Sequence, residues 1–126
     1  MHLGHTDQGI REARTLLGPD KIVGASCYGE LALARAAVEA GASYVAFGGF
    51  YPSPVKKYTF VTPPELLDQA RAEFSLPIVI IGGMTPANAA PLVARGVDLV
   101  AAITSVYGAR DPAVPARAFG ALFSAV

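Results

Sequence analysis

Residues 78–88 constrain the fold of this chain more than any other stretch. They begin with Ile78–Ile81, a β-branched run typical of a strand buried on both faces, as in a parallel sheet. Gly82–Gly83 follows, and without Cβ atoms such a turn lets the backbone approach a ligand closely. Thr85 suits a helix cap and Pro86 the first helical position, where free N–H groups attract anions. The stretch therefore predicts a phosphate-binding turn, and a tight turn without a ligand explains the same residues equally well.

Strand and helix patterns alternate along the rest of the chain. We expect strands at residues 21–26, 44–47, 78–81 and 98–103. We expect helices from a Thr6 or Asp7 cap to about Leu17, and at about 30–40, 63–74, 86–95 and 113–125. None of the strands alternates cleanly between apolar and polar residues, which indicates that all of them are covered on both faces. This order is typical of parallel strands joined by helical crossovers, and the fold class is α/β.

An internal repeat favours a barrel. Residues 40–46 resemble residues 95–101, which suits a (β/α)8 barrel of TIM type built from repeated pieces, although an open four-stranded sheet stays possible. About four βα units and a preceding helix cannot close such a barrel. We therefore expect residues 1–126 to be a single domain that forms the C-terminal part of a longer barrel or completes itself by association. Met1 stands before what reads as the end of a strand, which favours truncation.

Composition excludes several classes of function. The chain has 126 residues, 52% hydrophobic and 16% charged, with a formal net charge of zero, so it can form a dry core. Without a basic patch we expect no nucleic-acid partner, and without a long apolar run we expect no membrane span. The one cysteine, Cys27, cannot form an internal disulfide, which fits a cytoplasmic location.

Polar residues and glycines gather where the strands end. Ligands of parallel α/β folds bind at those ends. The ends offer His2, His5 and Asp7; Ser26, Cys27 and Tyr28; Gly48, Gly49, Ser53, Lys56 and Lys57; Gly82, Gly83 and Thr85; Thr104 and Ser105. Cations, hydroxyls and glycine-flanked amides together predict a site for an anionic, phosphorylated ligand.

Each of these residues also has a purely structural explanation. The two histidines can be exposed rather than metal-bound, and Asp7 can cap a helix instead of binding Mg²⁺. Cys27 lacks an evident base and is better explained as a small core residue than as a nucleophile. Ser26 can bond the backbone, the two lysines can be solvated, and Thr104 with Ser105 can cap the next turn.

Five segments in chain order resemble thiamine phosphate synthase. The resemblance covers essentially the whole chain but only the C-terminal half, or slightly more, of the family's barrel. The segments are residues 2–7, 24–28, 41–48, 51–56, and 81–84 with Asn88.

The resemblance implies a transferase of thiamine biosynthesis. This family couples hydroxymethylpyrimidine diphosphate to a thiazole phosphate with Mg²⁺ and releases pyrophosphate. Asp7 matches a Mg²⁺ carboxylate, and Ser26 matches a serine near the diphosphate and pyrimidine. Lys56 matches the lysine on the diphosphate, and Ser53 the first threonine of a Thr-x-Thr-Lys loop. The residues that match the thiazole phosphate cradle are Gly82, Gly83, Ile103 and Thr104.

The chain departs from the family pattern in three places. Val55 replaces the second threonine of the loop, and His5-Thr6 stands where the family has glutamine and an acid. The family's N-terminal strands are absent, and with them the arginine and lysine that hold the diphosphate and an Asn-Asp pair for Mg²⁺. We therefore expect the chain alone to be weak or inactive, and to self-associate through its open edges.

Two other functions compete with this interpretation. One is a thiazole tautomerase-like isomerase, which shares the barrel and the glycine turn but uses a histidine base after the Ser26 strand. Here Tyr28 occupies that position and both histidines lie elsewhere in the sequence. The other is a non-catalytic half-barrel that binds phosphate or pairs with another chain.

Overall fold

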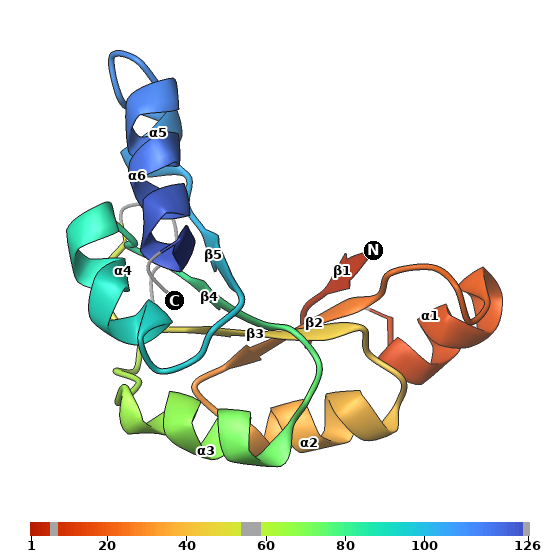
Figure 1. Ribbon diagram of the computed structural model, residues 1–126. Coiled ribbons are helices and arrows are strands. Elements are labelled where there is room, and N and C mark those ends of the chain that lie inside the picture. The colour runs from red at the N-terminus through yellow and green to blue at the C-terminus, as the bar shows by residue number, and fades with distance from the viewer. Residues whose placement is uncertain (6–7, 54–58, 125–126) are drawn as a thin grey trace.

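One parallel sheet with helical connections forms the structure (Figure 1). The computed structural model describes residues 1–5, 8–53 and 59–124. Within them the elements are β1 (His2–Leu3), α1 (Ile10–Leu17), β2 (Gly24–Tyr28), α2 (Leu31–Glu39), β3 (Tyr44–Gly48), α3 (Glu65–Glu73), β4 (Ile78–Ile81), α4 (Pro86–Val93), β5 (Leu99–Ala101), α5 (Thr104–Tyr107) and α6 (Ala113–Ser124). The sheet order is β1-β2-β3-β4-β5, and all neighbours are parallel.

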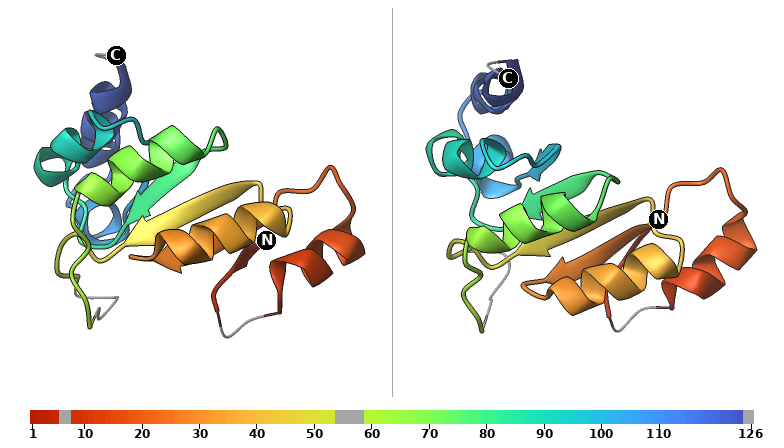
Figure 2. Two further views of the ribbon diagram at one scale, coloured as in Figure 1. Left: turned by 90° about the horizontal axis from the view of Figure 1, so that it is seen from below. Right: turned by 60° about the horizontal axis from the view of Figure 1, so that its bottom comes forward.

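The two faces of the sheet differ in chemistry. Phe47, Ile78 and Ile80 are fully buried in the main core, on the face that α2 and α3 cover (Figure 2). The alternate positions carry smaller or polar residues, such as Ser26, Ala46 and Gly48. In the described part of the chain, no helix covers this second face over β2 and β3 (Figure 1). We call it the inner face, and it is where a ligand has room to bind.

The central strand and the helix after it form as the sequence predicts. The β4 strand spans Ile78–Ile81, and α4 begins at Pro86 with Thr85 as its N-cap. The Asn88 backbone N–H donates to Thr85 Oγ1 at 3.1 Å, and the Thr85 N–H donates to Asn88 Oδ1 at 2.8 Å. This reciprocal capping fixes the chain direction just after the two glycines.

Several predicted boundaries are wrong. The strand end expected at the first residues is present, since His2–Leu3 pairs with β2 as a fifth strand of the described chain, but other boundaries differ. Residues 21–26 were expected to be a strand, but β2 spans Gly24–Tyr28. The N-cap position of α1 is Gly9, while Thr6 and Asp7 lie outside the described residues. Thr104 and Ser105 begin the short helix α5 rather than a turn.

The last strand is not covered on both faces as expected. Leu99 of β5 is 50% exposed, whereas Val45 of β3 is fully buried. Ile103 and Tyr107, next along the chain, are also exposed. The prediction fails because Val100 and Ala102 pack against the core on one face of β5, whereas the described chain leaves the opposite face, with Leu99 and Ile103, uncovered.

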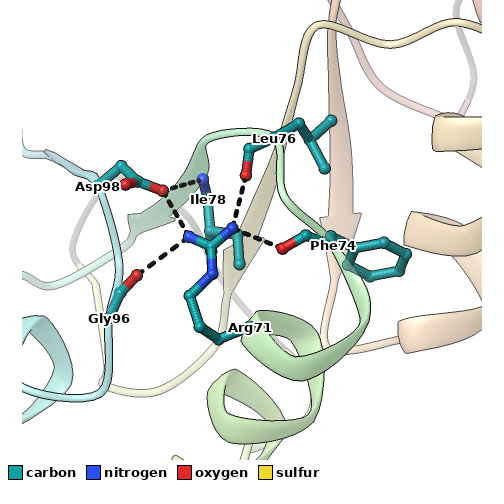
Figure 3. A network of polar contacts seen from close by, with 6 residues as sticks. All are labelled: Arg71, Phe74, Leu76, Ile78, Gly96 and Asp98. Atoms are coloured by element: carbon teal, nitrogen blue, oxygen red, sulfur yellow. Dashed lines mark hydrogen bonds and ion pairs between the residues drawn. The ribbon is translucent and has the colours of Figure 1, made fainter.

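An arginine network ties together the end of the sheet opposite the glycine turn (Figure 3). Arg71 of α3 donates to the carbonyls of Phe74 at 2.6 Å, Leu76 at 3.0 Å and Gly96 at 3.2 Å. It also donates to Asp98 Oδ2 at 2.8 Å, and the same oxygen accepts the Ile78 N–H at 2.9 Å. The network fixes where β4 begins and therefore where its glycine turn emerges.

No helix of the described residues is long and apolar enough to cross a membrane.

Candidate functional site

A cavity of about 900 Å³ opens on the inner face at the carboxyl ends of β2 and β3. Sequence reasoning placed Ser26 and Gly48 at this edge, and both line the cavity. Its lining is His5, Ser26, Tyr28, Gly29, Glu30, Leu33, Ala46, Gly48, Thr59, Phe60, Val61, Thr62 and Ile81.

Ser26 is held by a hydrogen-bonded chain that the sequence did not reveal. His2 Nε2 lies 2.7 Å from Ser26 Oγ, and His2 Nδ1 lies 2.7 Å from the Tyr44 hydroxyl. The His2 and Tyr44 rings stack with centroids 5.7 Å apart. Burial raises the pKa of Tyr44, so its hydroxyl stays protonated at neutral pH. The hydrogen bond between His2 and Ser26 excludes the interpretation that Ser26 bonds only to the backbone.

A second histidine-tyrosine pair borders the same cavity. His5 Nδ1 lies 3.0 Å from the Tyr28 hydroxyl, with the rings edge to face. Tyr28 has φ 53°, an uncommon conformation for a residue with a Cβ, and it follows an irregularity in the β2–β3 register. The histidines, distant from the Ser26 strand in sequence, therefore lie against Ser26 and Tyr28 in space. Parallel pairing of β1 with β2 brings them there.

A smaller cavity, of about 40 Å³, lies beside the first. It brings together the residues matched to the phosphate cradle, Gly82, Gly83, Ile103 and Thr104, with Ser53 of the loop after β3. Ile81 borders both cavities, so the two are neighbours along β4. The turn after β4, the loop after β3 and the segment after β5 thus meet at one place.

Gly83 is required at its position by close packing. Its φ is 65°, and a Cβ built on it would lie 2.0 Å from the Pro52 carbonyl oxygen. Asn88 Nδ2 donates to the Gly83 carbonyl at 2.9 Å, and Ser105 Oγ donates to the Met84 carbonyl at 2.6 Å. The turn is therefore rigid from several sides before any ligand arrives, which favours binding.

The loop after β3 is closed at its base. Thr62 is 2% exposed, its Oγ1 donates to the Gly48 carbonyl at 2.6 Å, and its N–H donates to the Gly49 carbonyl at 2.9 Å. The Tyr51 hydroxyl donates to the Asn88 carbonyl at 2.7 Å, which ties the loop to α4. Val55 and Lys56, at the last two positions of the segment that resembles the Thr-x-Thr-Lys loop, lie outside the described residues.

The described residues do not by themselves fit a metal site. Among residues 1–5, 8–53 and 59–124, no three His, Cys, Asp or Glu side chains group together. Asp7, the predicted Mg²⁺ ligand, lies outside these ranges.

Cys27 packs in the core and does not face the cavity. It is fully buried, and burial raises the pKa of its thiol to about 12. A thiol so rarely ionised is a poor nucleophile, which supports the interpretation of Cys27 as a small core residue.

The arrangement offers glycine amides and hydroxyls in a small cavity beside a larger one that holds a serine. Residues 1–106 match the family described as thiamine monophosphate synthase. The chain belongs to this family.

Relatives within the thiamine monophosphate synthase family support the match along the chain. The thiamine-phosphate synthase of Janthinobacterium sp. (strain Marseille) is 59% identical over 124 residues, which are 98% of this chain and 60% of that protein. That of Thiobacillus denitrificans is 51% identical over 125 residues, 99% of this chain and 59% of that protein. The chain thus spans about 60% of the length of these relatives.

A solved structure supports the fold. The thiamine phosphate pyrophosphorylase from Pyrococcus furiosus superposes with a TM-score of 0.84 at 30% identity, covering 98% of this chain and 58% of that one. The predicted fold class is confirmed: the parallel strands and helices match part of a TIM-barrel thiamine phosphate synthase.

Proposed function

We propose that this chain forms the thiazole-phosphate side of a thiamine phosphate synthase site, together with part of its diphosphate side. The whole site would couple hydroxymethylpyrimidine diphosphate to thiazole phosphate and release pyrophosphate, a transferase reaction in cytoplasmic thiamine biosynthesis. Residues 1–126 would be one domain, the C-terminal part of a (β/α)8 barrel. The chain alone would be weakly active or inactive and would self-associate.

The observation that carries this proposal is the small cavity after β4. It is bordered by the Gly82–Gly83 turn and by three hydroxyl residues, with Ile103 at its side; the hydroxyl residues are Ser53, Thr104 and Ser105. Hydroxyls and glycine amides are neutral donors that hold a phosphate without a fixed cation. The larger cavity next to it would take the pyrimidine diphosphate, placing the thiazole nitrogen near the carbon that the diphosphate leaves.

Ser26 and Lys56 would act on the diphosphate. Ser26 Oγ borders the larger cavity and would donate to a diphosphate oxygen. Lys56, carried over from the family motif, would balance the charge that grows as the diphosphate departs. Mg²⁺ would be held in part by Asp7 and would stabilise the same charge.

Binding of the thiazole phosphate tests the cradle directly. We expect the chain to bind hydroxyethylthiazole phosphate in isothermal titration calorimetry, and G83A to weaken this binding at least about tenfold. The added Cβ would collide with the Pro52 backbone oxygen and open the turn. G120A is the matched control, because a Cβ at Gly120 meets nothing within 4 Å. Equal affinity in G83A, or no binding by the unaltered chain, would contradict the cradle.

A second candidate is a thiazole tautomerase-like isomerase. One observation favours it: His5 borders the large cavity at the end of the Ser26 strand, where such an enzyme uses a histidine base. Incubation with the thiazole tautomer substrate and with the two synthase substrates separates the functions. Isomerisation that H5Q abolishes would support the isomerase, whereas thiamine phosphate formation, however slow, would support the synthase. Binding of phosphate ligands with neither reaction would favour the non-catalytic half-barrel.

A further inference from the structure

Three neighbouring strands place a tyrosine, a histidine and a serine in one hydrogen-bonded line on the inner face. Tyr44 begins β3, His2 begins β1, and Ser26 lies in the middle of β2. The two hydrogen bonds are both 2.7 Å long, and both involve ring nitrogens of His2. The line ends at Ser26, the member that borders the large cavity.

Gly24 leaves the space that this line needs. In the parallel register, Gly24 stands between His2 and Tyr44. A Cβ built on Gly24 would lie 1.9 Å from Tyr44 Cζ, so the tyrosine ring occupies the volume that a side chain would fill. The ring can therefore lean over β2 and reach the histidine of β1.

The acidity of the groups fixes the direction of the hydrogen bonds. A neutral imidazole has one N–H donor and one acceptor nitrogen. The phenol is a good donor and a weak acceptor, so it donates to His2 Nδ1, and the imidazole proton is then on Nε2. The Nε2–H donates to Ser26 Oγ, which leaves the serine proton free to point elsewhere. An imidazolium donates from both nitrogens and gives Ser26 the same acceptor role.

We propose that Tyr44 and His2 are positioning residues that turn the Ser26 hydroxyl proton into the cavity, where it donates to an anionic oxygen of the ligand. Only the identity of that anion as a diphosphate rests on the proposed function. The opposite direction would make Ser26 the donor to His2, as in an activated serine nucleophile. The line of hydrogen bonds from Tyr44 through His2 to Ser26, which we call the relay, thus assigns Ser26 to anion binding. It excludes Ser26 as a nucleophile.

The tautomer of His2 tests the direction of the relay. Long-range ¹H–¹⁵N correlation spectra at about pH 8.5, where an ordinary imidazole is neutral, distinguish a protonated Nε2 from a protonated Nδ1. We expect the Nε2–H form in the unaltered chain and a mixture of both forms in Y44F, which lacks the phenol donor. Y28F is the matched control, because Tyr28 contacts His5 and not His2 in the described contacts. An Nδ1–H form in the unaltered chain, or no change in Y44F, would overturn the proposal.

Anion affinity tests the consequence for Ser26. Inorganic pyrophosphate with Mg²⁺ is the probe, titrated into the chain and its variants by calorimetry. We expect S26A and Y44F each to weaken binding by about two- to tenfold, the effect of one lost or misdirected hydrogen bond. H2Q keeps an amide N–H toward Ser26 and should retain more affinity than H2A. Circular dichroism checks that each variant is folded.

The outcomes of the two experiments separate the relay from the proposed function. Unchanged pyrophosphate affinity in Y44F beside a weakened S26A would overturn the positioning role. If the unaltered chain binds no pyrophosphate, the diphosphate site of the proposed function is contradicted, and the tautomer of His2 still decides the relay.

Discussion

Arg14 and Arg71 hold two helix-to-strand connections with the same geometry but different partners. Arg14 donates to the Gly41 carbonyl at 3.0 and 2.8 Å and to Ser43 Oγ at 2.8 Å. Arg71 donates to the Gly96 carbonyl at 3.2 Å and to Asp98 Oδ2 at 2.8 Å. The internal repeat of residues 40–46 and 95–101 is therefore also a repeat of structure.

The two clamps differ in charge at one position. Ser43 Oγ accepts the Val23 N–H at 2.9 Å, and Asp98 Oδ2 accepts the Ile78 N–H at the same distance. The Ser43 hydroxyl and the Asp98 carboxylate thus have the same role. Each accepts the N–H at the start of a strand and a hydrogen bond from an arginine. Geometry, more than the ion pair, is what the connection requires. Asp98 is about half exposed, so water screens its charge.

Removing each arginine should have the largest effect. We expect R14A and R71A each to lower the free energy of unfolding by about 3 kcal/mol, because several backbone carbonyls lose their donors at once. The two values should agree within about 1 kcal/mol, since the extra ion pair of Arg71 is partly exposed. Urea denaturation measures both. If R71A lowers the free energy of unfolding several times more than R14A does, the ion pair of Arg71 contributes more than the hydrogen bonds that the two arginines share.

Adding a Cβ at the turn glycines should have an intermediate effect. Gly41 has φ 101° and Gly96 has φ 99°, so alanine is strained at both by about 1–3 kcal/mol. G96A should cost more, because its Cβ would lie 3.1 Å from Arg71 Cδ, against 3.4 Å to Arg14 Cγ for G41A. Thermal unfolding measures the difference, and G120A serves as the unstrained control. A reversed order would mean that Arg71 shifts more readily than Arg14.

Exchanging the charged partner for the neutral one should have the smallest effect. D98S gives the second clamp the chemistry of the first, and we expect a loss below about 1 kcal/mol. The stability of the unaltered chain should fall slightly with salt, and D98S should remove that part of the dependence. S43A, which leaves the Val23 N–H without its acceptor, should cost more than D98S. The opposite ranking in denaturation at two salt concentrations would contradict the comparison.

Local patterns were enough for much of the fold. Ile78–Ile81 and the Thr85 cap depend on residues close in sequence, and both were predicted correctly. The start of β2 was not, because the apolar pair Ile22-Val23 reads as strand while Ile22 is 66% exposed. The Ile22 carbonyl accepts a hydrogen bond from the Met1 amino group, and the Met1 carbonyl accepts the Gly24 N–H, so where β2 begins depends on its pairing with the first residues of the chain. Such a partner, twenty-one residues away, leaves no trace in a local pattern.

The candidate site divides in the same way. Ser53, Gly82, Gly83 and Thr104 each follow a strand, so the rule that parallel strands end together was enough to group them. The line from Tyr44 through His2 to Ser26 depends on the register of three strands and on the space above Gly24. Neither the register nor this space can be read from the spacing of residues along the chain. Once the register is known, Gly24 opposite Tyr44 indicates where the tyrosine ring can lie.

The closed base of the loop after β3 has a consequence for how the length of that loop can vary. Thr62 holds Gly48 and Gly49 through two hydrogen bonds, so the ends of the loop meet at a fixed point of the sheet. The cost of closing a loop grows only slowly with its length. Phe50 packs in the core and Tyr51 bonds to α4, so the first residues of the loop belong to the scaffold, while a change of length beyond them would cost little. The fixed ends thus separate the stability of the sheet from the length of the segment between them.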